Sequence, residues 1–208
     1  PNGTIIPARG FVSFTETDMG FGLAAAGESV SFKTPDQSRV LDAVQFTAPP
    51  NGVAPGRWPD GANDFYRLQA KTPGAPNAPI LISDVVINEL MYDPISGNDD
   101  DQYIELYNRS GGAVDLSGWQ LSDGVSYTIP TNTTLAAGGY LVIARNAAQL
   151  ISHYGNLNTA NCLGNFGGKL AHGGEHLALT KPVEHKVLDG GGNTVTNIIN
   201  VMVNDMTY

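Results

Sequence analysis

Short runs of β-branched and aromatic residues alternate with turn-forming residues along most of the chain, and this pattern constrains the fold more than any other feature. Nine runs are expected to form strands: residues 10–15, 29–33, 40–46, 85–92, 103–107, 126–129, 140–144, 176–180 and 198–203. Helical periodicity is confined to residues 144–154. Many short strands separated by turns are typical of a sandwich or barrel, so we predict an all-β fold.

Charge and hydropathy argue against two classes of partner. The 208 residues include 11 Lys and Arg against 20 Asp and Glu, which gives a net charge of −9. Affinity for nucleic acid depends on clustered basic side chains that release counterions from phosphates, and the cations here are scattered singly. The chain also lacks the run of about 18 apolar residues that a membrane-spanning helix needs. We therefore expect neither nucleic-acid binding nor a membrane span.

A proline-rich segment and an internal repeat divide the chain. Residues 71–79 contain three prolines; because proline cannot continue a central strand, we predict a linker at residues 71–80. Residues 4–14 are similar to residues 134–144 at an offset of 130, and residues 21–32 are similar to residues 168–179 at an offset of 147. The second copy therefore carries an insert, near residues 146–167.

This repeat predicts two related domains of unequal completeness. Residues 1–70 are expected to form the C-terminal part of one β-sandwich. Residues 81–208 are expected to form a second sandwich that contains the insert and whose C-terminal end is missing. On this interpretation the chain is a segment of a longer tandem array.

Five motifs follow one another in the second copy. They are Ile87-Asn88-Glu89-Leu90, Tyr103-Ile104-Glu105-Leu106-Tyr107-Asn108, Val114-Asp115-Leu116-Ser117-Gly118-Trp119, Tyr127-Thr128-Ile129-Pro130 and Gly138-Gly139-Tyr140-Leu141-Val142. This order closely resembles the lamin tail domain, and residues 56–61 and 72–77 resemble the ending of its bacterial version. The resemblance implies immunoglobulin-like β-sandwiches of the bacterial extracellular type, in tandem.

Two sequence features could suggest catalysis, but the residues around each of them argue against it. Residues 172–176 match the H-x-x-E-H pattern of inverted zinc peptidases, but Gly173 and Gly174 oppose the helix that this chemistry needs. The repeat aligns the stretch with residues 25–29, which favours a turn that enters a strand. Cys162 lies in the insert without a sequence cue for a lowered thiol pKa. We predict no catalytic or cofactor-binding residues, and hence no enzyme.

One acidic patch is the candidate metal site. Asp99, Asp100 and Asp101 are adjacent and follow Asn98. Several oxygen ligands on a flexible loop suit Ca²⁺, although the patch lacks the spacing and the glycine of an EF-hand. The alternative interpretation is a solvated loop without metal.

The resemblance and the charge lead to two functional expectations. The first is a non-catalytic structural or interaction module of a larger multidomain bacterial protein, extracellular or at the cell surface. It would act as a scaffold or as an adhesive, filament-forming unit, with protein partners and self-association through open sheet edges. The alternative is a carbohydrate- or calcium-binding accessory module of a secreted hydrolase. Trp58, Tyr66 and Tyr107 would then form a stacking surface for polysaccharide.

Overall fold

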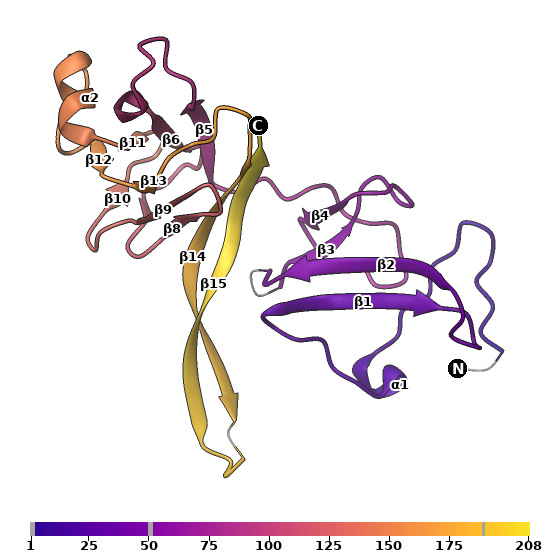
Figure 1. Ribbon diagram of the computed structural model, residues 1–208. Coiled ribbons are helices and arrows are strands. Elements are labelled where there is room, and N and C mark those ends of the chain that lie inside the picture. Colours follow the sequence, from indigo (N-terminus) through magenta and orange to yellow (C-terminus); the bar gives the residue numbers. More distant parts are fainter. Residues whose placement is uncertain (1–2, 50–51, 189) are drawn as a thin grey trace. The chain divides into compact units, whose positions relative to one another are not determined.

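The computed structural model describes residues 3–49, 52–188 and 190–208, and the chain divides into two compact units. Unit 1 ends at Ile82, and unit 2 runs from Ser83 to Tyr208. Strands dominate both units and helices are few (Figure 1), which confirms the predicted all-β class. No helix in the described ranges is long and apolar enough to cross a membrane.

Unit 1 consists of two antiparallel hairpins and a short helix. Its elements are α1 (Glu16–Met19), β1 (Gly27–Lys33), β2 (Val40–Thr47), β3 (Ala54–Arg57) and β4 (Phe65–Leu68). Strand β1 pairs with β2 and β3 pairs with β4, so each sheet has two strands. Two-stranded sheets bury little apolar surface. Among the described residues of this unit, the buried ones are Ala48, Gly56 and Leu68.

The proline-rich segment contains no strand over residues 71–79. Its Asn77 is bound to the β3–β4 hairpin of unit 1: the backbone N–H donates to Asp60 and the side-chain amide donates to the Arg57 carbonyl, both at 3.0 Å. The division between the units follows this segment, after Ile82.

Unit 2 is a β-sandwich of two main sheets. One has the order β12 (Cys162–Gly164), β11 (Tyr140–Ala144), β6 (Tyr103–Asn108), β5 (Val85–Met91). The other has the order β13 (Gly167–Gly168), β9 (Val125–Thr128), β8 (Gln120–Ser122), β14 (His176–Leu188), β15 (Thr194–Thr207). A two-stranded sheet pairs β7 (Val114–Asp115) with β10 (Thr134–Leu135).

The core of unit 2 lies between its two main sheets. Strand β6 alternates, so that Ile104 and Leu106 are fully buried while Glu105 lies on the outer face. The core cluster comprises the buried residues Val85, Ile104, Leu106, Leu116, Trp119, Leu121, Val125, Ile129, Leu135, Leu141, Ile143, Phe166, Leu170, Leu177, Leu179 and Val203. Half of these belong to residues 85–129, and the rest come from the later part of the chain.

The predicted insert packs against the outer face of the four-stranded sheet. It begins with helix α2 (Ala147–His153), which confirms the helix predicted within residues 144–154. Asn146 caps this helix by accepting a hydrogen bond from the Gln149 N–H at 3.2 Å. A second small apolar cluster joins the insert to β11 and consists of Val142, Ala144, Leu150 and Cys162.

Strands β14 and β15 form a ribbon that extends well beyond the sandwich (Figure 1). Strand β8 pairs with β14 only from Ala178 to Thr180. Beyond that point, residues 181–188 pair with residues 194–201 alone among the described strands. We call residues 181–188 and 194–200 the distal ribbon. The strands predicted at residues 176–180 and 198–203 cover only parts of β14 and β15.

The strand predicted at residues 10–15 is absent from the structure, so that prediction was wrong. Helix α1 follows these residues directly, and Thr15 caps it by accepting from the Asp18 N–H. The segment of unit 2 that the sequence repeat aligns with these residues forms β11, which lies between β6 and β12. The described part of unit 1 offers residues 10–15 no such neighbours, and a strand needs a partner to satisfy its backbone hydrogen bonds.

Candidate functional site

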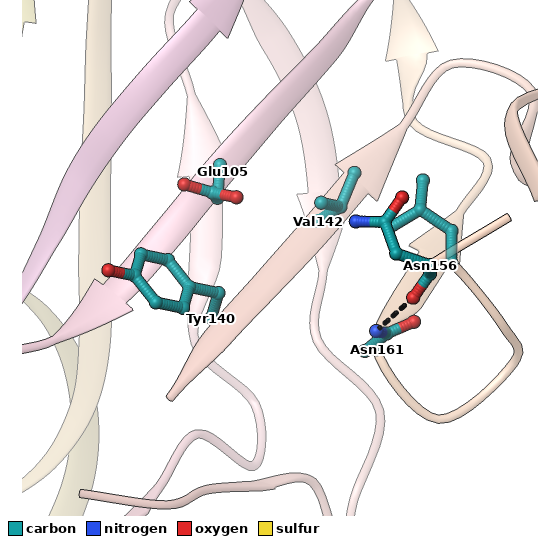
Figure 2. A pocket seen from close by; sticks show the side chains of 6 residues that line it. Glu105, Tyr140, Val142, Asn156 and Asn161 are labelled. Carbon is teal, nitrogen blue, oxygen red and sulfur yellow. Dashed lines mark hydrogen bonds between the residues drawn. The ribbon is translucent and has the colours of Figure 1, made fainter. Parts of the chain in front are cut away.

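A shallow groove lies on the outer face of the four-stranded sheet, beside the insert (Figure 2). It has a volume of about 270 Å³ and is lined by Glu105, Tyr140, Val142, Asn156, Leu157 and Asn161. We call it the outer groove. The pleat of two neighbouring strands builds its floor, because Glu105 of β6 lies opposite Val142 of β11. The loop after α2 builds its wall, where the Asn161 side chain donates to the Asn156 carbonyl at 3.0 Å.

An aromatic pair stands next to the outer groove. Tyr140 and Tyr107 lie opposite each other on β11 and β6, and their rings stack with centroids 4.7 Å apart. Tyr140 is 53% exposed. Asn88 donates to Glu105 at 2.8 Å, which fixes the carboxylate on the same face. A flat ring beside amide and carboxylate groups can stack on one face of a ligand while hydrogen-bonding its edge.

Of the three aromatic residues predicted to form a stacking surface, Tyr107 alone takes part in this arrangement. Trp58 and Tyr66 belong to unit 1, whereas Tyr107 belongs to unit 2, so the three side chains do not form one surface on a single unit. Tyr140, Asn156 and Asn161 were not among the predicted site residues. The outward position of Tyr140 follows only from the two-residue period of a strand whose Leu141 and Ile143 face the core, whereas the return of the asparagine loop to the sheet has no local signal.

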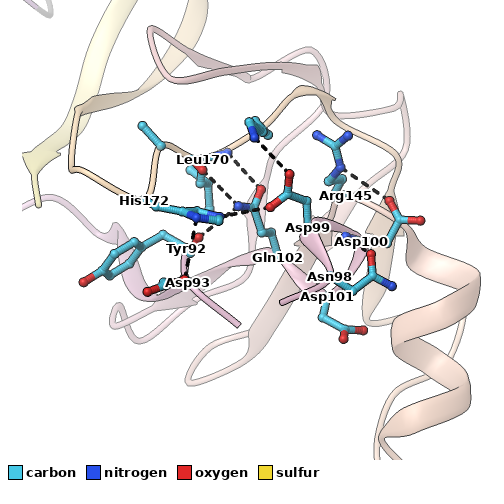
Figure 3. A network of polar contacts seen from close by, with 12 residues as sticks. Tyr92, Asp93, Asn98, Asp99, Asp100, Asp101, Gln102, Arg145, Leu170 and His172 are labelled. Atoms are coloured by element: carbon cyan, nitrogen blue, oxygen red, sulfur yellow. Dashed lines mark hydrogen bonds and ion pairs between the residues drawn. The ribbon is translucent and has the colours of Figure 1, made fainter. Parts of the chain in front are cut away.

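The acidic patch forms a polar network instead of an open loop (Figure 3). Asp99, Asp100 and Asp101 make up the single 3-10 turn η1 (Asp99–Asp101), so their side chains point in different directions. Asp99 contacts Lys169 at 3.1 Å and His172 at 3.0 Å.

The other two carboxylates reach α2 and its N-terminal neighbours. Asp100 pairs with Arg145 at 3.4 Å. Asp101 accepts from Gln149 at 2.7 Å and from Ser96 at 2.6 Å. The network therefore ties η1 to two distant segments of unit 2, residues 145–149 and 169–172.

The network also sets the charge state of its carboxylates. The hydrogen bond from Lys169 lowers the pKa of Asp99 below its usual value, with a further contribution from His172. The hydrogen bonds from Ser96 and Gln149 lower the pKa of Asp101. Both groups are thus held as carboxylates by neighbours within the protein.

A buried amide anchors the network to the core. Gln102 follows η1 and is fully buried. Its side chain donates to the carbonyls of Tyr92 and Leu170 and accepts from the Leu170 N–H, each at 2.9 Å (Figure 3). The two hydrogen bonds with Leu170 span 68 positions of the chain, so Gln102 joins η1 to a distant segment of unit 2.

The structure does not bring the Asp99–Asp101 carboxylates together around a common point. Among the described residues, no group of three or more His, Cys, Asp or Glu side chains is placed to hold a metal ion. A calcium site at these residues stays a prediction, and Ca²⁺ would have to displace the internal partners of the carboxylates.

The H-x-x-E-H stretch forms a turn that leads into β14. His172 contacts Asp99, whereas His176 contacts Asp123 at 2.9 Å. Between them, Glu175 accepts from the Ala171 N–H at 2.8 Å and thereby closes the turn. The two imidazoles serve different networks, so the stretch does not form the helical zinc site that its letters suggest.

The single cysteine is shielded. Cys162 is 2% exposed in the cluster beneath α2. Burial raises the pKa of its thiol above the usual value and keeps it protonated, which is the opposite of what a nucleophile needs.

Comparison with known proteins adds one match. The family model described as Lamin Tail Domain matches residues 81–198. This range contains the outer groove, the η1 network and most of the ribbon. No curated protein matches the chain.

Proposed function

Because the chain belongs to the Lamin Tail Domain family of immunoglobulin-like β-sandwiches, we propose that it is a non-catalytic structural or interaction module. It would be part of a larger multidomain bacterial protein, extracellular or at the cell surface. The chain has one cysteine, which is buried. It can form no disulfide within the chain, so the fold does not depend on the redox state of its compartment. Tandem sandwiches joined by a proline-rich segment would act as spacers that present loops and sheet edges.

The observation that carries the proposal is the distal ribbon. Strand β15 is the last strand of its sheet, and residues 194–204 contain no charged side chain. Long edge strands are usually protected by charges, prolines or bulges, because their unpaired backbone groups can recruit another strand. The bulge in this ribbon lies at Leu179/Thr180, next to the sandwich and away from its tip.

The two edges of the ribbon differ in protection. Strand β14 carries Pro182, which has no N–H to donate, and the charged Glu184 and Lys186. Strand β15 instead exposes Val195 and Ile198, the latter 64% accessible. The pairing surface is therefore the β15 edge over residues 194–200, and its partner is the same edge of a second copy. Antiparallel pairing of two identical edges closes a two-fold dimer, which would join two parent proteins.

Light scattering of the purified chain over a concentration series tests this proposal. We expect the mass to rise from monomer to dimer, and Ile198→Lys to keep the chain monomeric by placing a charge at the edge. Ile95→Lys is the matched control, because Ile95 is a fully exposed loop residue of the same unit. A monomer at every concentration, or equal dimerisation of Ile198→Lys and wild type, would refute the proposal.

A second candidate function rests on the outer groove. A stacked, exposed tyrosine beside carboxylate and amide groups matches the way sugars are held, by apolar contact on one ring face and hydrogen bonds around the rim. The chain would then be an accessory module that binds a neutral polysaccharide for an attached hydrolase. The charge of −9 disfavours polyanionic glycans.

Affinity electrophoresis in gels that contain neutral polysaccharides separates the two candidates. Tyr140→Ala should abolish retardation, while Tyr66→Ala, which removes an exposed tyrosine of unit 1, should leave it unchanged. Retardation that survives Tyr140→Ala, or none for the wild type in any gel, would eliminate the groove as a sugar site and leave the dimer proposal untouched.

A further inference from the structure

The two copies of the internal repeat fold into the same turn. Gly27 and Gly174 both adopt left-handed φ angles, 96° and 87°. The N–H of Gly27 donates to the Ala24 carbonyl at 3.0 Å, and that of Gly174 donates to the Ala171 carbonyl at 3.1 Å. In each copy the next residue, a glutamate, accepts from the N–H of that alanine, at 2.7 Å and 2.8 Å. The offset of 147 therefore aligns equivalent positions.

The first block of the repeat also shares a turn, with its register corrected by one residue. The N–H of Gly10 donates to the Pro7 carbonyl at 2.8 Å, and that of Gly139 donates to the Ala136 carbonyl at 2.9 Å. The residues before these glycines, Arg9 and Gly138, have φ angles of 56° and 67°. These turns correspond at an offset of 129, whereas the sequence comparison predicted 130.

Apolar positions that are buried in unit 2 are exposed in unit 1. In unit 2, four core positions are at most 5% exposed: Leu135, Leu141, Ile143 and Leu179. Their counterparts in unit 1 are 57%, 40%, 42% and 68% exposed, in the order Ile6, Val12, Phe14 and Phe32. Exposed side chains of this size on one small unit mark a surface that normally has a partner.

Unit 2 shows what lies against the equivalent positions in its own core. Leu141 and Ile143 lie opposite Leu106 and Ile104 of β6, and Leu179 lies opposite Leu121 of β8. Residues 85–129 thus cover these positions, and we call this range the front segment. The described residues of unit 1 contain no strands equivalent to β6 or β8, and β1 pairs only with β2 there.

We propose that these exposed apolar positions of unit 1 form the docking surface for a second front segment, of the same strand pattern as residues 85–129. In unit 2 the front segment precedes the repeat, so a front segment for unit 1 would be joined ahead of residue 5. Strand addition to β1 and to residues 10–15 would complete a sandwich and bury Val12, Phe14 and Phe32. The front segment of another copy is not available, because it supplies half of its own unit's core.

A duplicated front segment tests the proposal in the full chain. Residues 83–133 are copied and joined directly to Ile5, and hydrogen exchange is measured for residues 11–15 and 29–32. We expect these amides to exchange at least about 100-fold more slowly than in the unmodified chain, because they would join a cooperative core. The matched control carries Leu106→Asp and Leu121→Asp in the added copy only, and it should give no protection.

Phe32→Asp supplies a second test that does not depend on the folding of the duplicated chain. In the unmodified chain this change should leave hydrogen exchange of β1 and β2 unchanged within twofold, because Phe32 is largely exposed. In the duplicated chain it should abolish the new protection. The proposal is overturned if Phe32→Asp accelerates exchange in the unmodified chain, or if the Asp-substituted copy protects unit 1 as well as the native copy does. It is also overturned if the unmodified chain protects unit 1 only as its concentration rises, which would make a second copy the partner.

Discussion

Replacing Asn108 by alanine should destabilise unit 2 more than any other single polar change on β6. Asn108 is fully buried, and its amide donates to the carbonyls of Leu135, Ala136 and Gly112 at 2.8–3.1 Å. Its carbonyl oxygen accepts from the Ser110 N–H at 3.0 Å. Asn108→Ala therefore leaves at least one buried carbonyl and one backbone N–H without these partners. Each buried unsatisfied group costs about 1–3 kcal/mol, so we expect a loss of about 3 kcal/mol.

Urea unfolding followed by tryptophan fluorescence measures this loss. A Trp58→Phe background leaves Trp119, a core residue of unit 2, as the single reporter. With an m-value of about 2 kcal/mol/M, the midpoint should fall by about 1.5 M. Asn197→Ala, at an exposed position of the ribbon, is the control and should shift the midpoint little. A loss below about 1 kcal/mol for Asn108→Ala would refute the view that this amide holds the loops around β6 and β10 in place.

Three further predictions concern charge, metal and the thiol. Hydrogen bonds lower the pKa of Asp101 in the folded state, so its contribution to stability is fully present above the unfolded-state pKa of about 3.9 and is lost as the pH falls through the lower pKa of the folded state. Asp101→Asn should therefore weaken the fall of the urea midpoint at acid pH. Calorimetric titration with Ca²⁺ should give the same heat for the wild type and for the double variant Asp99→Asn, Asp101→Asn, since both carboxylates already have internal partners. Binding heat that the wild type shows and the double variant lacks would establish a calcium site. Cys162 should react with a thiol reagent at least about 100-fold faster in urea than in buffer, because it is buried; equal rates would contradict its burial.

The strands that the sequence predicts well are those with a clear apolar pattern and a local turn. Residues 103–107 alternate between core and surface, residues 140–144 form a continuous apolar run after a glycine turn, and the structure places β6 and β11 there. The Asp123-Gly124 pair joins β8 to β9 in a tight hairpin. Such features depend on near neighbours in the chain, so periodicity and turn chemistry are sufficient to find them.

Features that depend on distant partners are not predictable in this way. Residues 10–15 alternate as well as any strand but form none, because a ladder needs a second strand. The η1 network joins Asp99 to Lys169 and His172, more than 65 positions away. The outer groove likewise forms only when the loop at Asn156 returns to the sheet. No local pattern encodes these contacts, although each residue type suits the role that it takes.

Hydrogen exchange along β15 tests whether this module associates through the exposed edge of its ribbon. Amides of residues 194–200 are to be compared at low and high protein concentration, with residues 104–106 of the core as internal reference. We predict that exchange at residues 194–200 slows as the concentration rises, while the reference stays constant, and that Ile198→Lys removes the effect. Exchange at these residues that is independent of concentration, in a chain whose core remains protected, would show that the β15 edge is not the pairing surface.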